Sequence, residues 1–92
     1  MEKLTELMII TMEECGELTQ ACSKLLRKQD FAKKQNVYSI LEDSKQELTK
    51  EVADVMCMIE LMQEQGLVNL IDIKEGIKSK RNKLKTWSNL IT

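Results

Sequence analysis

The segment VADVMCMIELM, residues 52–62, decides the fold class, because only Asp54 and Glu60 interrupt its apolar residues. A helix that is apolar nearly all round belongs at the centre of a bundle or in an interface between subunits. The rest of the chain also favours helix, since it has no proline and three aromatic residues and is rich in Glu, Lys, Leu, Met and Gln. The fold class predicted is all-α, an antiparallel bundle of three to four helices.

Helical periodicity divides the chain into three predicted helices. The first covers about residues 3–27, and the polar stretch 28–36 forms the first connection. The second covers residues 37–65, with a possible break where Ser44 could cap a new start. The last covers residues 69–87, and its polar side is a stripe of lysines and an arginine.

The length of the chain limits how much surface it can bury. Ninety-two residues make one predicted domain, residues 1–92. A chain this short buries only about 60 to 65% of the surface that it exposes when unfolded. We therefore expect a homodimer or homotetramer to complete the bundle.

Charge and hydropathy exclude several classes of partner. The net charge is −1, so no global basic field attracts nucleic acid, and nucleic-acid binding is not expected. No apolar run reaches the roughly 18 residues of a membrane-spanning helix, and the chain starts without the cationic segment of a signal peptide. We expect a cytoplasmic protein without a membrane partner. Cys15, Cys22 and Cys57 form no CxxC pair and are expected to be small buried hydrophobes in a reducing compartment.

Two acidic pairs fall on the apolar faces of different predicted helices. At about 100° per residue, Glu14 lies near the middle of the apolar face of the first helix, and Glu17 lies at its edge. In the second helix Glu51 lies among apolar residues, and Asp54 borders the same face. Glu47, one turn before Glu51, is either an extra ligand or a solvated acid.

If these two helices pack antiparallel, their four carboxylates converge. Ionised groups are costly to desolvate and repel one another there, so a cation should lie between them. Oxygen ligands suit a hard ion such as Mg²⁺, for which Mn²⁺ could substitute. The Glu-x-x-His pairs of a di-iron site cannot be built, because the chain has no histidine. The alternative is that all four are ordinary solvated residues.

The same residues carry a resemblance to a known family. EECGE at residues 13–17 matches the EExxE motif, and EVAD at residues 51–54 matches the ExxD motif, of the MazG-like all-α nucleoside triphosphate pyrophosphohydrolases. The chain resembles this family from the first helix to the end of the second. The resemblance implies hydrolysis of a nucleoside triphosphate to a monophosphate and pyrophosphate, in the control of nucleotide pools.

The resemblance also implies roles for individual residues. The Mg²⁺ ligands would be Glu14, Glu17, Glu51 and Asp54. Glu13, at the edge of the site, and Glu17 would orient or deprotonate water. Lys78 and Arg81, on the basic stripe of the last helix, would contact the substrate's phosphates, although this helix aligns less cleanly with the family's pattern and its stripe could equally be a solvated face.

Two other readings remain open. A dUTPase-like or phosphoribosyl-ATP pyrophosphatase-like hydrolase would use the same motifs on another substrate. A non-catalytic helical interaction module would use the Met-rich second helix to bind a partner, with the acids serving solubility.

Overall fold

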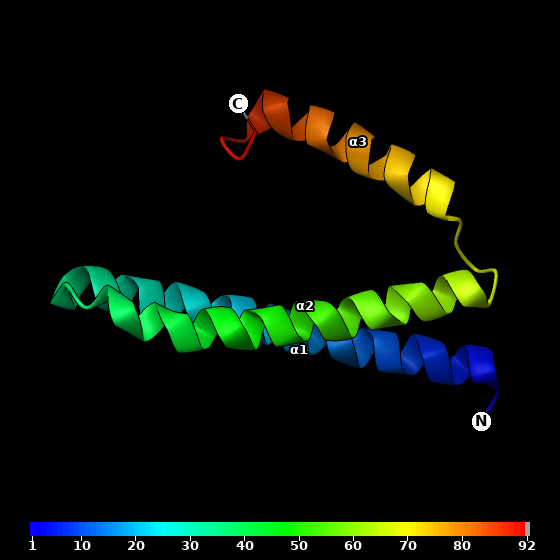
Figure 1. Ribbon diagram of the computed structural model, residues 1–92, viewed down its shortest axis with the longest axis horizontal. Coiled ribbons are helices and arrows are strands. Elements are labelled where there is room, and N and C mark those ends of the chain that lie inside the picture. The colour runs from blue at the N-terminus through cyan, green and yellow to red at the C-terminus, as the bar shows by residue number, and fades with distance from the viewer. Residues whose placement is uncertain (92) are drawn as a thin grey trace. The chain divides into compact units, whose positions relative to one another are not determined.

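The structure, a computed structural model, describes residues 1–91 and is built from helices. Their order is α1 (Lys3–Gln35), a short 3-10 turn η1 (Tyr38–Ile40), α2 (Leu41–Glu64) and α3 (Leu70–Trp87) (Figure 1). No strand occurs within residues 1–91. The prediction of an all-α fold is confirmed.

The chain forms two compact units, Met1–Leu61 and Met62–Thr92. The first contains α1, η1 and most of α2. The second contains the end of α2, the turn after it and α3. The predicted single domain of residues 1–92 stays a prediction.

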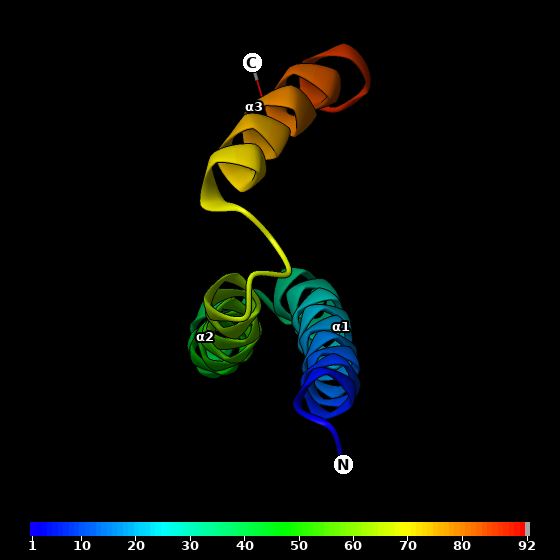
Figure 2. The same cartoon turned by 90° about the vertical axis from the view of Figure 1, so that its right-hand side faces the viewer.

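In the first unit, α1 and α2 pack against each other as an antiparallel hairpin, side by side in both views (Figures 1 and 2). The residues that they turn inward recur at alternating steps of three and four, the spacing of a coiled-coil seam. On α1 the seam contains Leu7, Thr11, Glu14, Leu18, Ala21, Leu25 and Ala32. On α2 it contains Leu41, Ser44, Leu48, Glu51, Val55 and Met58. Each helix therefore places one glutamate in a core position.

The first helix is longer than predicted. The expected end near Arg27 and the loop at residues 28–36 are wrong, because α1 continues to Gln35 and ends at Asn36, which has left-handed backbone angles (φ 56°). An ion pair of 3.1 Å joins the side chains of Asp30 and Lys34 one turn apart, and Ala32 is fully buried at the seam period. The polar residues that suggested a loop are the solvent face of a helix.

The predicted break at Ser44 is also wrong. Helix α2 begins at Leu41, directly after η1, and Ser44 lies inside it as a seam residue that is 2% exposed. Its hydroxyl oxygen is buried without a hydrogen-bond partner. Ser44 therefore acts as a small core residue and caps no helix.

All three cysteines are exposed, which contradicts their expected burial. Cys15, Cys22 and Cys57 each adjoin a seam residue in the sequence, at positions about 100° away from it around the helix. Their apolar character does not place them in the core, because the seam of two helices is narrow.

In the second unit, Gly66 provides a positive φ of 74° at the end of α2. The side chain of Asn69 then caps α3, accepting hydrogen bonds from the backbone N–H groups of Ile71 (2.8 Å) and Asp72 (3.2 Å). Trp87, near the end of α3, is 67% exposed, and the Lys80 ammonium lies 5.2 Å from its ring centroid. Among the described helices, none is long and apolar enough to cross a membrane.

The seam predicts that replacing two neighbouring methionines of α2 by alanine will lower the free energy of unfolding by very different amounts. Met58 is 7% exposed and Met56 is 57% exposed. We expect Met58→Ala to lower the free energy of unfolding by about 2 to 3 kcal/mol, because it leaves a cavity in the seam. The matched change Met56→Ala should cost well under about 1 kcal/mol. Urea unfolding followed by circular dichroism measures both, and equal losses would contradict this seam.

Candidate metal centre

The structure brings the four predicted ligands together. Helix α1 supplies Glu14 and Glu17, and α2 supplies Glu51 and Asp54. One carboxylate oxygen from each residue lies within 4.8 Å of the chosen oxygens of the other three. Four oxygens at this separation could hold one metal ion between them.

Local helical geometry explains why these residues meet. In each helix the two acids are three residues apart, so they lie nearly one turn apart on the same side. Glu14 and Glu51 occupy seam positions, while Glu17 and Asp54 lie at the flank of the seam. The antiparallel pairing of α1 and α2 then brings the two pairs face to face.

The surroundings of Glu14 and Glu51 disfavour their charged forms. Burial raises the pKa of Glu14 above its ordinary value of 4.5, and the negative charges of Glu17, Asp54 and Glu51 raise it further. Burial likewise raises the pKa of Glu51, with Glu17 and Asp54 adding to the effect and Lys50 opposing it. The cluster therefore favours the binding of protons or of a cation.

Unpartnered atoms point to the same conclusion. Oε2 of Glu14 and Oε2 of Glu51 are both buried and have no hydrogen-bond partner. Buried carboxylate oxygens are normally hydrogen-bonded or bound to a cation, because an unsatisfied one loses its hydration without compensation. The donor set is all oxygen, which fits Mg²⁺ or Mn²⁺.

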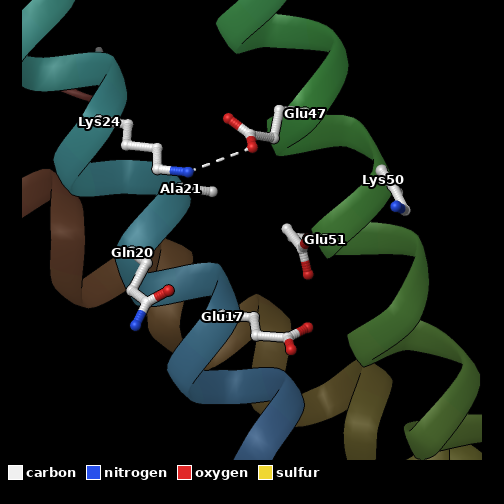
Figure 3. Close-up of a pocket in the computed structure, with 7 residues that line it drawn as sticks. All are labelled: Glu17, Gln20, Ala21, Lys24, Glu47, Lys50 and Glu51. Carbon is white, nitrogen blue, oxygen red and sulfur yellow. Dashed lines mark hydrogen bonds and ion pairs between the residues drawn. The ribbon is translucent and has the colours of Figure 1, made fainter.

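A small cavity lies beside the cluster. Its volume is about 300 Å³, and its walls come from both helices (Figure 3). The lining residues are Glu17, Gln20, Ala21, Lys24, Glu47, Lys50 and Glu51. All of them except Ala21 are polar, and two are lysines that the sequence analysis did not single out.

An ion pair spans the hairpin at this cavity. Nζ of Lys24 on α1 lies 3.3 Å from Oε1 of Glu47 on α2 (Figure 3). Glu47 is exposed and is not one of the four clustered acids, which agrees with the interpretation as a solvated acid, and its carboxylate also pairs with Lys24. The two residues are 23 positions apart, so only the register of the hairpin reveals the pair.

Three other predicted site residues lie outside the cluster. Glu13 is exposed on α1 and is not one of the four clustered acids. Lys78 and Arg81 are exposed on α3 and belong to the second unit. Their predicted roles in catalysis and substrate binding stay predictions.

Comparison with known proteins identifies no relative: no family model, no curated protein and no solved structure matches the chain. The class that the fold and the site define is an all-α protein of three helices with a candidate acidic metal centre in a helical hairpin. A narrower assignment rests on the motifs alone.

The raised pKa values predict how the stability of the metal-free protein depends on pH. A carboxyl whose pKa is higher in the folded state stabilises that state below the unfolded pKa, and the contribution is lost as the pH rises through the folded pKa. We therefore expect the melting temperature of metal-free protein to fall as the pH rises from about 4.5 toward neutrality. Differential scanning fluorimetry across this range measures the trend, which should be weaker in Glu51→Gln.

A second measurement follows the melting temperature when Mg²⁺ is added at neutral pH. An ion that binds only the folded state stabilises it by mass action, by about 2.7 kcal/mol at 100 times its dissociation constant. The rise in melting temperature should be lost in Glu51→Gln and kept in Glu60→Gln, an exposed position of α2 outside the cluster. Equal rises in both variants would exclude the cluster as the binding site.

Proposed function

We propose that this protein is a Mg²⁺-dependent nucleoside triphosphate pyrophosphohydrolase, which releases a nucleoside monophosphate and pyrophosphate. The observation that carries the proposal is the convergence of four carboxylates, two from each helix of an antiparallel hairpin. These are the acids of the EExxE and ExxD motifs that the chain shares with the MazG-like hydrolases. The resemblance of the motifs and the convergence of their acids in one cluster together support the proposal.

The residues of the cluster divide into two roles. Glu14 and Glu51, each with a buried unpartnered oxygen, would hold the ion from the seam, with Asp54 beside them. When bound, the ion would polarise the phosphate chain and lower the pKa of a water molecule. Glu17, the exposed member of the cluster, would contribute a fourth oxygen to the ion and would also accept a proton from the attacking water.

The reaction needs little covalent chemistry from the protein. Water adds to one of the two phosphorus atoms of the α–β phosphoanhydride, its proton passes to Glu17, and the P–O bond that joins the monophosphate to the pyrophosphate breaks. Most of the catalysis in phosphoryl transfer is positioning and charge neutralisation. Glu13, next to Glu14 and exposed, would orient water at the edge of the site.

The choice of base lies outside what the carboxylates determine. None of the aromatic residues lines the cavity beside the cluster, so this cavity offers no stacking surface for a base. A dUTPase-like or phosphoribosyl-ATP pyrophosphatase-like hydrolase would use the same chemistry on a different substrate.

The proposed assembly is a homodimer or homotetramer. Large apolar side chains are exposed on both helices of the hairpin, among them Met12 and Leu26 on α1 and Val52 and Met56 on α2. Exposed apolar surface of this kind commonly marks an interface. Light scattering at micromolar concentration should give a mass of two or four chains of 10.7 kDa, and a monomeric mass would refute the assembly.

The activity is tested by pyrophosphate and phosphate release from a panel of canonical and modified NTPs and dNTPs. We expect release that requires Mg²⁺, is abolished by EDTA, and falls by about 100-fold or more in Glu51→Gln, because loss of one charged ligand weakens transition-state stabilisation. Glu60→Gln should retain full activity.

Silence across the whole panel in a folded, Mg²⁺-binding protein would contradict the proposal. The exposed methionines of α1 and α2 would then favour the helical interaction module. If the protein is such a module, the substitution Glu51→Gln should leave its function unchanged.

A further inference from the structure

The cavity beside the carboxylate cluster has a charge balance that depends on the metal. Together with the other two clustered acids, Glu14 and Asp54, the site holds five carboxylates, and its two lysines, Lys24 and Lys50, leave a formal charge of −3. A divalent cation at the cluster would reduce this to −1. A bound cation would therefore remove most of the repulsion of an anion, and the two lysines are the cationic groups left to attract it.

The shape and lining of the cavity favour a compact polyanion. A volume of about 300 Å³ is at the small end for a ligand site, and polar groups form nearly all of its wall. Lysines supply flexible point charges that suit phosphate oxygens. A nucleobase has no apolar surface to pack against in this cavity, whereas a short phosphate chain would meet the cation site at one end and a lysine at the other.

The positions along α1 match an extended ligand. Lys24 follows Glu17 by seven residues, or two turns, which is about 10 Å along the helix axis. Between them, Ala21 is buried in the seam and presents only a methyl group to the cavity. A phosphate chain with one end at the carboxylates would therefore extend along α1 toward Lys24 past Ala21, with the polar side chain of Gln20 also in the cavity wall.

The ion pair of Lys24 and Glu47 holds the lysine in place and can be exchanged. Both side chains are nearly half exposed, and ion pairs of this kind are weak because water screens them. A phosphate oxygen accepts the same kind of charge-assisted hydrogen bond from an ammonium group as the Glu47 carboxylate does, and a phosphate chain offers several such oxygens. Glu47 thus keeps Lys24 extended across the hairpin until a phosphate replaces it.

From this arrangement we propose that Lys24, assisted by Lys50 at the rim, binds the distal phosphates of a polyphosphate chain whose near end lies at the carboxylate cluster. The proposal rests on the proposed function and deepens it, since it assigns a phosphate site inside the first unit. It does not require Lys78 or Arg81. Lys24 acts here as a binding residue and takes no part in proton transfer.

The test is the binding of inorganic pyrophosphate in the presence of Mg²⁺, measured by isothermal titration calorimetry. We expect Lys24→Gln to weaken binding about 10-fold or more, Lys50→Gln to weaken it less, and Lys24→Arg to retain most of it. The matched control is Lys45→Gln, which removes a lysine from an exposed ion pair with Glu42 on α2, away from the cavity. Mn²⁺ binding, followed by electron paramagnetic resonance, should be the same in all four variants.

The outcomes separate this proposal from the proposed function. Wild-type protein that does not bind pyrophosphate, Lys24→Gln that binds it as well as wild type, or equal losses in Lys24→Gln and Lys45→Gln would each overturn the phosphate site. Loss of Mn²⁺ binding in Lys24→Gln would do the same, because Lys24 would then act on the metal centre. Lysine-dependent pyrophosphate binding without hydrolysis of any nucleotide would support the site and contradict the enzyme.

Discussion

The burial of like charges between two helices is the constraint on which the rest of this structure depends. A seam of alternating three- and four-residue steps is normally filled by apolar side chains, yet Glu14 and Glu51 take two of its places. Each loses hydration there, and each is repelled by Glu17 and Asp54. Folding of the hairpin and neutralisation of the cluster are therefore coupled, so the residues that weaken the core are also those that could give it a function.

Periodicity predicts much of the fold and the four clustered acids, because both depend on local geometry. A step of about 100° per residue places Glu14 and Glu51 among apolar neighbours, and antiparallel packing then brings them together. The end of α1 could not be predicted in the same way. Residues 28–35 are polar except for Phe31 and Ala32, and polarity alone does not distinguish a loop from a helix with one narrow buried edge, which here is Ala32. The helix start predicted at Ser44 was wrong for a related reason, because serine is favoured as a helix cap and is also small enough to pack in a core.

The neighbours of the cluster were harder to predict than the cluster itself. Lys24 and Glu47 are exposed, belong to no motif and lie on different helices, so their pairing follows only from the register of the hairpin. The cysteines show the opposite error, because their apolar character suggested burial while the seam is too narrow to include them. Composition thus predicts which residues can be buried, and register decides which ones are.

Register also gives the connection between the helices an importance that its own residues do not suggest. If α2 slid along α1 by one heptad, seam residues would still face seam residues, but Glu51 would then lie about 10 Å from its present partners. Residues 36–40 join the helices with little slack and select the register in which the acids meet. That connection is about 30 Å along α1 from Glu14. The length of a remote turn, and not only the identity of four acids, is thus a determinant of whether a metal centre exists at all.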